Sequence, residues 1–249
     1  MEVSKYCQKI WELINRMKYN QIIAKLKSLS DPKNIEGMKR FAVGGKNTLG
    51  ISIPVLRKLA KDLNREYKND ANAKHKLALN LFASGIHEAR ILAGMIDEPG
   101  LVTEKQMDSW IADFDSWDIC DQICMNLFDK TKFAYEKASE WAKRKPEFEK
   151  RAGFALIACL AWHDKLAPDE KFIKFLPIIK RESTDERNFV RKAVNWALRH
   201  IGKRNMRLRA EALKTAEEIK KINNKTAKWV AGDAIRELNN PKIIKSIIN

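Results

Sequence analysis

The sequence predicts an all-α protein built as an array of paired helices. Only 10 glycines and 7 prolines occur in its 249 residues, and apolar residues recur with a helical period along almost the whole chain. Alternating β-branched runs are missing. The helices recur as pairs at roughly 35–40 residues, a rhythm typical of HEAT or armadillo solenoids. We therefore expect one domain, residues 1–249, in which about six HEAT-like antiparallel helix pairs form a right-handed superhelix with a concave basic groove. Residues 1–51 are expected to pack on it as N-terminal helices and a loop.

The individual helices follow from apolar periodicity and from residues that begin or end helices. Asn240-Pro241 is typical of a cap followed by a first-turn proline, and Ser183 and Glu186 have the spacing of a capping box. Residues 30–51, which are rich in glycine, are predicted to form a loop. The predicted helices span residues 4–29, 53–68, 71–84, 86–97, 104–114, 117–129, 131–144, 147–162, 168–181, 186–202, 206–221, 225–239 and 241–248.

The composition indicates a polyanionic partner. Lysine and arginine outnumber aspartate and glutamate by 48 to 32, which gives a net charge of +16. An anionic membrane is disfavoured as the partner because no basic amphipathic tail is present. No run of 18 apolar residues occurs and the N-terminus lacks the blocks of a signal peptide. We therefore expect a cytoplasmic protein, associated with the nucleoid if it is prokaryotic.

The cysteines do not form a metal site in the sequence pattern. Cys7, Cys120, Cys124 and Cys159 contain no CxxC pair, and the four histidines are scattered singly. No zinc ligand set can be assembled from this spacing. The cysteines are predicted to be small buried residues in a reducing compartment, and neither a metal nor an organic cofactor is expected.

A strongly basic segment surrounds Trp196. On a helical wheel, Trp196 projects away from the apolar stripe that includes Val190 and Ile201. Two interpretations follow: the indole packs under a neighbouring helix, or it stacks on the base of a ligand whose phosphates the basic residues bind. The segment has no acid between Glu186 and Glu211, and its basic residues are Arg187, Arg191, Lys192, Arg199, Lys203, Arg204, Arg207 and Arg209.

An acidic segment precedes the basic one. Within it, Trp117 and Asp121 are four residues apart at the start of a predicted helix, so an indole and a carboxylate share one edge. Asp118 lies in the first turn, where it can interact with the helix N-terminus. Asp121 lies too far along the helix to cap it. It is either a functional carboxylate or the partner of an arginine on an adjacent helix.

Four short motifs, in this order and spacing, resemble the DNA alkylation repair family of AlkD type. The resemblance extends from about residue 35 to residue 238. The motifs are Leu49-Gly-Ile-Ser-Ile-Pro54 with Leu56-Arg57, Ser116-Trp-Asp-Ile-Cys-Asp121, Lys150-Arg151-Ala152, and Phe189-Val-Arg-Lys-Ala-Val-Asn-Trp196-Ala-Leu-Arg199.

The resemblance implies roles for particular residues. Asp121 matches the catalytic aspartate of the family, Trp117 and Trp196 match its two active-site tryptophans, and Arg151 matches an arginine that contacts the DNA backbone. Phe41 stands where the better-known branch has a tyrosine, which keeps a ring and loses a hydroxyl. Trp110 and Trp162 match no functional position and are predicted to pack in the core. The expected DNA-binding residues are Phe41, Lys150, Arg151, Lys192, Arg199, Lys203 and Arg204.

The function implied is a DNA glycosylase that acts as a monomer on duplex DNA. It would hydrolyse the N-glycosidic bond of purines alkylated at N3 or N7, in base excision repair. Such purines are cationic and leave readily, so the protein needs mainly a carboxylate that stabilises the oxocarbenium-like sugar. The alternatives are a non-catalytic HEAT-repeat protein that binds damaged or structured nucleic acid through phosphates, RNA included, and a protein-binding scaffold.

Overall fold

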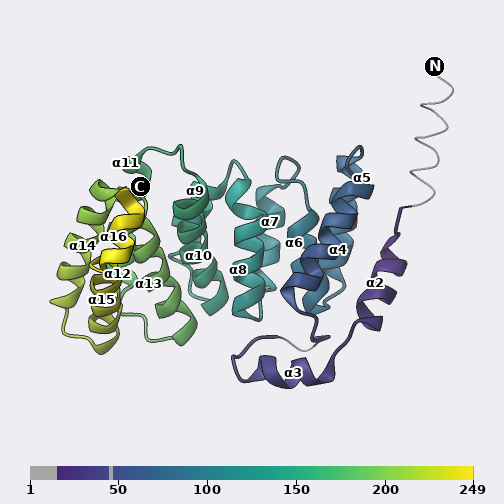
Figure 1. The fold of residues 1–249 in the computed structure, drawn as a ribbon, viewed down its shortest axis with the longest axis horizontal. Coiled ribbons are helices and arrows are strands. Elements are labelled where there is room, and N and C mark those ends of the chain that lie inside the picture. Colours follow the sequence, from purple (N-terminus) through teal and green to yellow (C-terminus); the bar gives the residue numbers. More distant parts are fainter. Residues whose placement is uncertain (1–15, 45–46, 249) are drawn as a thin grey trace, which may run out of the picture. The chain divides into compact units, whose positions relative to one another are not determined.

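The computed structural model describes residues 16–44 and 47–248, and all regular secondary structure in that part of the chain is helical (Figure 1). The predicted all-α class is therefore confirmed. The chain divides into two compact units, residues 1–103 (unit 1) and residues 104–249 (unit 2). Within the described residues, no helix is both long and apolar enough to cross a membrane.

Unit 1 is made of five described helices around a leucine-rich core. Its interior includes Leu56, Leu63, Leu81 and Leu92, all four of which are fully buried. The helices are α2 (Tyr19–Ser28), α3 (Pro32–Lys39), α4 (Ile53–Glu66), α5 (Ala71–Ala83) and α6 (His87–Ile96).

Two predictions about unit 1 were wrong in part. Residues 30–51 contain helix α3, because Asp31 accepts hydrogen bonds from the amides of Lys33 and Asn34, at 2.9 and 3.3 Å, and Pro32 fits the first turn. The glycines in this segment concealed that cap. The helix predicted at 4–29 is helical only from Tyr19 within the described residues, and its first part, residues 4–15, lies outside them.

The segment before α4 is fixed to α6 by one buried carboxylate. Glu88 accepts hydrogen bonds from three successive backbone amides, those of Leu49, Gly50 and Ile51, at 2.9, 2.7 and 3.2 Å. Gly50 has a φ of 82°, and a Cβ there would overlap the Asp31 carbonyl oxygen. The turn therefore requires glycine at this position and a carboxylate at residue 88.

Unit 2 begins with α7 and contains the motifs of both the acidic and the basic segment. The helix predicted at 168–181 is divided in two, because Pro177 fits only the first turn of a new helix. The predicted capping box at Ser183 was also wrong, since α13 begins at Asn188 and the Ser183 hydroxyl donates to the carbonyl of Lys180. The elements are α7 (Glu104–Ala112), α8 (Trp117–Asn126), η1 (Phe128–Lys130), α9 (Ala134–Trp141), α10 (Glu147–His163), α11 (Asp169–Ile173), α12 (Leu176–Glu182), α13 (Asn188–Gly202), α14 (Met206–Lys220), α15 (Lys225–Leu238) and α16 (Pro241–Ile248).

Helix α10 is the core of unit 2. Every residue from Arg151 to Ala161 is buried, because α8, α9 and α13 all pack against this helix (Figure 1). A Cβ at Gly153 would overlap the backbone of Ala142, so this glycine allows α10 and the end of α9 to approach closely. A helix that is apolar on all sides is expected in such a central position.

Side-chain bonds link α8, α10, α13 and α15 in succession. Arg151 of α10 bonds Asp121 of α8 and the Phe189 carbonyl of α13, while Asn195 of α13 donates to the Val230 carbonyl of α15 at 3.1 Å. These links span 30, 38 and 35 residues, and the last two fall within the predicted rhythm of a HEAT-like repeat. The single-domain arrangement, the handedness and the concave groove stay predictions.

Candidate functional site

A buried ion pair between Asp121 and Arg151 lies at the centre of the candidate site. Arg151 donates from Nε to Asp121 Oδ1 at 3.0 Å and from Nη2 to Oδ2 at 2.7 Å. The Asp121 side chain is 14% exposed and the Arg151 side chain is 7% exposed. Arg151 Nη1 also donates to the Phe189 carbonyl at 2.6 Å. Of the two interpretations of Asp121, the structure thus contains the arginine partner, and the pair joins α8, α10 and α13.

The pair has an asymmetric electrostatic environment. Burial raises the pKa of Asp121, and the Arg151 guanidinium opposes this increase. For Arg151, burial alone would lower the pKa. The Asp121 carboxylate raises it by more, so the net change in the pKa of Arg151 is an increase. The arginine therefore keeps its charge, while the aspartate is easier to protonate than an aspartate at the surface.

Trp117 completes this cluster. Its indole is partly exposed, and the Arg151 guanidinium lies over the ring at 5.7 Å from the centroid. Trp117 and Asp121 therefore contact the same arginine, as their positions on one helix edge suggest. Asp118 is buried and accepts a hydrogen bond from the Ser116 hydroxyl, so it supports the start of α8.

Trp196 lies on a partly exposed face of α13. The stripe from Val190 to Ile201 is fully buried, whereas Trp196, which projects away from it on the helical wheel, is partly exposed. Its ring meets His200 edge-on, with centroids 5.7 Å apart. Phe189 and Trp196 are two turns apart on the same side of the helix, about 10 Å along its axis. The family resemblance implies that Trp196 lies within reach of Trp117 and Asp121, and this stays a prediction.

Folding compensates much of the basic segment with acids from other helices. Lys203 and Arg199 both bind Glu237 of α15, Lys203 at 2.8 Å. Arg207 binds Glu170 at 2.8 Å. The segment itself has no acid between Glu186 and Glu211, but acids from other helices compensate the charges of these side chains in the folded protein.

Two further expected phosphate contacts are also engaged within the protein. Lys150 binds Glu182 at 2.5 Å and Asp185 at 3.2 Å. Arg204 donates to the carbonyls of Ala161 and Ala167, at 2.8 and 3.3 Å. By contrast, Lys192 is exposed and has no ion pair with a described residue. Among the residues predicted to bind DNA, Lys192 thus combines exposure with the lack of an ion pair to any described residue.

Phe41 and the two remaining tryptophans differ in their placement. Phe41 is 74% exposed, in the turn after α3 of unit 1, and its role in DNA binding stays a prediction. Trp110 is buried as predicted. Trp162 was predicted to be buried, but it is 46% exposed. The periodicity of α10 could not reveal this, because nearly the whole helix is apolar and no polar face marks its exposed end.

The described residues of unit 2 line hollows in its surface, two of which bear on the site. One has a volume of about 220 Å³ and lies between the ends of α10 and α13, lined by Ala161, Trp162, Lys165, His200 and Lys203; we call it the His200 pocket. Neither Trp162 nor His200 was predicted to belong to a site. The one sequence feature that indicated an exposed Trp162 was its place just before the polar residues His163 and Lys165, where α10 ends.

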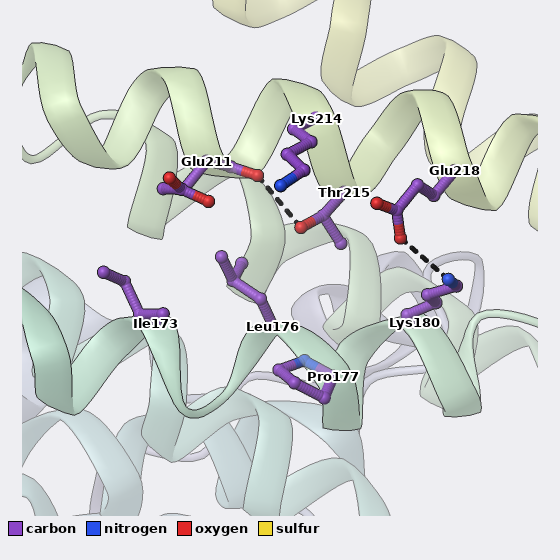
Figure 2. Close-up of a pocket in the computed structure, with 8 residues that line it drawn as sticks. All are labelled: Ile173, Leu176, Pro177, Lys180, Glu211, Lys214, Thr215 and Glu218. Atoms are coloured by element: carbon purple, nitrogen blue, oxygen red, sulfur yellow. Dashed lines mark hydrogen bonds and ion pairs between the residues drawn. The ribbon is translucent and has the colours of Figure 1, made fainter.

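The second hollow is unsuited to a polyanion. It has a volume of about 270 Å³ and lies between α14 and the α11–α12 segment (Figure 2). Lys180 is bound to Glu218 at 2.7 Å, and the Thr215 hydroxyl donates to the Glu211 carbonyl at 2.9 Å. With Lys214, the lining contains two basic and two acidic side chains, so its formal charges balance.

His200 is expected to make stability depend on pH. Burial, followed by Lys203, Arg199 and Lys165, lowers its pKa from 6.5 to about 3, against an opposing effect of Glu237. Because the unfolded chain binds a proton here near pH 6.5 and the folded chain does not, stability should fall as the pH drops from about 6.5 towards 3. His200→Gln should flatten this dependence in urea denaturation curves measured between pH 4 and 7. An unchanged pH slope would contradict the assignment.

Comparison with known proteins agrees with these observations. Residues 22–238 match the family described as DNA alkylation repair enzyme. One solved structure, from a new family of proteins related to the HEAT-like repeat DNA glycosylases with affinity for branched DNA structures, has a TM-score of 0.69. It is 19% identical, and the match covers 89% of this chain and 95% of that one. No individually curated protein matches the chain. At this identity the structural likeness shows the fold, and the family match shows that the chain belongs to the DNA alkylation repair enzyme family.

Proposed function

We propose that this protein is a DNA glycosylase that removes cationic N3- or N7-alkylated purines from duplex DNA. The positive charge makes the base a good leaving group, so no acid is needed to protonate it. The demanding requirement is to stabilise the positive charge that develops on the deoxyribose and to hold a water molecule for attack. In our proposal Asp121 meets both requirements, and the partly exposed indoles of Trp117 and Trp196 contact the sugar and the cationic base.

The observation that supports this proposal best is the fixed carboxylate of Asp121 beside a partly exposed tryptophan. Arg151 occupies one hydrogen-bonding site on each carboxylate oxygen. Each oxygen keeps another lone pair for water or for the sugar. Arg151 itself uses three of its five N–H groups, two on Asp121 and one on Phe189. The other two can donate to a DNA phosphate, so Arg151 is a positioning residue between backbone and carboxylate.

The direct test is release of a modified base. We expect the purified protein to liberate 7-methylguanine from a methylated duplex and to leave an abasic site, with the free base identified by mass spectrometry. Unmodified duplex is the control, since its neutral purines are poor leaving groups. Absence of any released base, from a preparation that binds the duplex, would refute glycosylase activity.

A second candidate is a non-catalytic protein that binds damaged or branched DNA. Two observations favour it: both oxygens of Asp121 are held by Arg151, and the structural relative belongs to a family with affinity for branched DNA structures. An arginine that stays on the carboxylate would neutralise the charge that catalysis needs. The base-release assay separates this candidate from the glycosylase.

Under either candidate, salt dependence should identify the phosphate contacts. Lys192→Ala should reduce the slope of log affinity against log salt by about one, because an unpaired lysine releases a counterion when it binds a phosphate. Lys203→Ala should change the slope less, because this lysine already binds Glu237 at 2.8 Å. Fluorescence anisotropy with a labelled duplex at several salt concentrations measures both. Equal effects of the two variants would contradict this ranking.

A further inference from the structure

The His200 pocket lies at one end of two helices whose other end is held together by Arg151. Eleven residues separate Arg151 from Trp162 on α10, and eleven separate Phe189 from His200 on α13. Arg151 bonds Phe189 at the first end, and Trp162 meets His200 at the second. The two helices therefore run parallel and in register, and the pocket is about 16 Å along the axis from the ion pair. That distance corresponds to roughly five nucleotide steps of a DNA strand.

The wall of the pocket offers an aromatic surface held in place. Trp162 is 46% exposed, yet its ring contacts His163 and His200, with centroid distances of 4.7 and 6.1 Å. His200 also meets Trp196 edge-on at 5.7 Å, which extends the row of rings towards the candidate site. An indole that is both exposed and oriented by its neighbours suits stacking on a planar ligand.

His200 adds hydrogen-bonding capacity without charge. Burial, with Lys203 and Arg199, lowers the pKa of this imidazole to about 3. At neutral pH it therefore has one donor and one acceptor nitrogen. A neutral ring of this kind can bond the edge of a nucleobase, which also combines donors and acceptors.

The charge of the pocket suits one phosphate. Lys203 is held by Glu237 at 2.8 Å, so it adds little net charge. Lys165 is exposed and makes no ion pair within the described part of the chain. The lining therefore combines a single available cation with an aromatic surface, which is the chemistry of one nucleotide rather than of a continuous backbone.

The loop that follows Lys165 adds an apolar contact at a fixed position. Leu166 is 97% exposed, although its loop is well anchored. Arg204 donates to the Ala167 carbonyl at 3.3 Å, and Asp164 accepts from the Ala167 amide at 3.1 Å. An exposed leucine on an anchored loop resembles the apolar wedges with which proteins contact unstacked bases.

We propose that the His200 pocket binds one unpaired nucleotide of DNA, with its base against Trp162 and His200 and its phosphate at Lys165. This inference rests on the proposed DNA binding and adds a specificity to it. The protein would prefer a duplex interrupted by an unstacked base over a continuous duplex. Only an unstacked base can fill the pocket while the paired DNA on either side of it remains against α13.

Fluorescence anisotropy with three labelled probes tests the proposal on the full chain. The probes are a continuous duplex, the same duplex with one unpaired adenine nucleotide, and that duplex with an abasic analogue at the unpaired position. We expect the adenine probe to bind about tenfold more tightly than either of the others, because stacking requires the base itself. The abasic probe controls for the bent backbone that both interrupted duplexes share.

Two matched tryptophan variants assign the preference to the pocket. Trp162→Ala should reduce the affinity ratio of adenine probe to continuous duplex from about ten to near one. Trp229→Ala, which removes a similarly exposed indole of α15 outside the pocket, should keep the ratio. Circular dichroism establishes that both variants are folded.

The outcomes separate this proposal from the one on which it rests. A ratio retained in Trp162→Ala, or a parent protein that binds all three probes equally, overturns the pocket assignment and leaves duplex binding intact. Failure of the parent protein to bind any probe overturns DNA binding itself, and the pocket assignment with it.

Discussion

Asp121→Asn is expected to reduce excision of 7-methylguanine by roughly 100-fold or more, because it removes the negative charge that stabilises the developing oxocarbenium ion. The amide is almost isosteric with the carboxylate and keeps one oxygen that accepts from Arg151. Affinity for the duplex should therefore stay within a few-fold of the parent value. Single-turnover release of the base, measured with protein in excess, gives the rate without interference from product release.

Two further measurements make this result interpretable. Glu136→Gln removes a carboxylate from an exposed position of α9 and should excise at the parental rate. Circular dichroism must show that the asparagine variant is folded at the assay temperature, since it weakens a buried ion pair. Excision at the parental rate by folded Asp121→Asn would remove Asp121 from the mechanism and favour the non-catalytic candidate.

Arg151→Ala is expected to lower the free energy of unfolding by about 3–5 kcal/mol, because it leaves the Asp121 carboxylate buried without a partner. It also removes the hydrogen bond to the Phe189 carbonyl, which ties α10 to α13. Urea denaturation of Arg151→Ala, of Asp121→Ala and of the double variant forms a cycle. The double variant should lose less stability than the sum of the single variants, by more than about 1 kcal/mol.

The pH dependence of Arg151→Ala provides an independent check. Burial raises the pKa of Asp121, and the Arg151 guanidinium opposes that increase. In Arg151→Ala this opposing effect is lost. The folded variant then binds a proton at a higher pH than the unfolded chain, so its deficit in stability should shrink as the pH falls. A deficit that is constant with pH would mean that lost packing, and not the unpaired carboxylate, causes the destabilisation.

Periodicity predicted most of the fold because most helices have a single buried face. The stripe of α13 from Val190 to Ile201 was identified in this way and is fully buried. Prediction failed where a short-range signal competed with the period. Asp31-Pro32 starts α3 inside a segment that its glycines marked as a loop, and Pro177 divides a helix that the apolar pattern treats as continuous.

The candidate site was less predictable because charge pairing is a long-range property. The sequence places Trp117 and Asp121 on one helix edge, and it offered the arginine partner as one of two alternatives. It could not reveal that Glu237, thirty-four residues after Lys203, would bind that lysine. Nor could it identify the exposed end of α10, since a helix buried along eleven consecutive residues gives no amphipathic signal at its terminus.

The common register of α10 and α13 limits how this region of the chain can change length. One residue inserted between Arg151 and Trp162 would turn the end of α10 by about 100° and advance it by about 1.5 Å. Trp162 would then leave His200, while Arg151 stayed bonded to Asp121 and Phe189. Insertions in the connections before α10 and α13, at residues 142–146 and 183–187, leave both helices in register. Among proteins that share this arrangement, length variation should therefore concentrate in those connections, with the eleven-residue intervals kept constant.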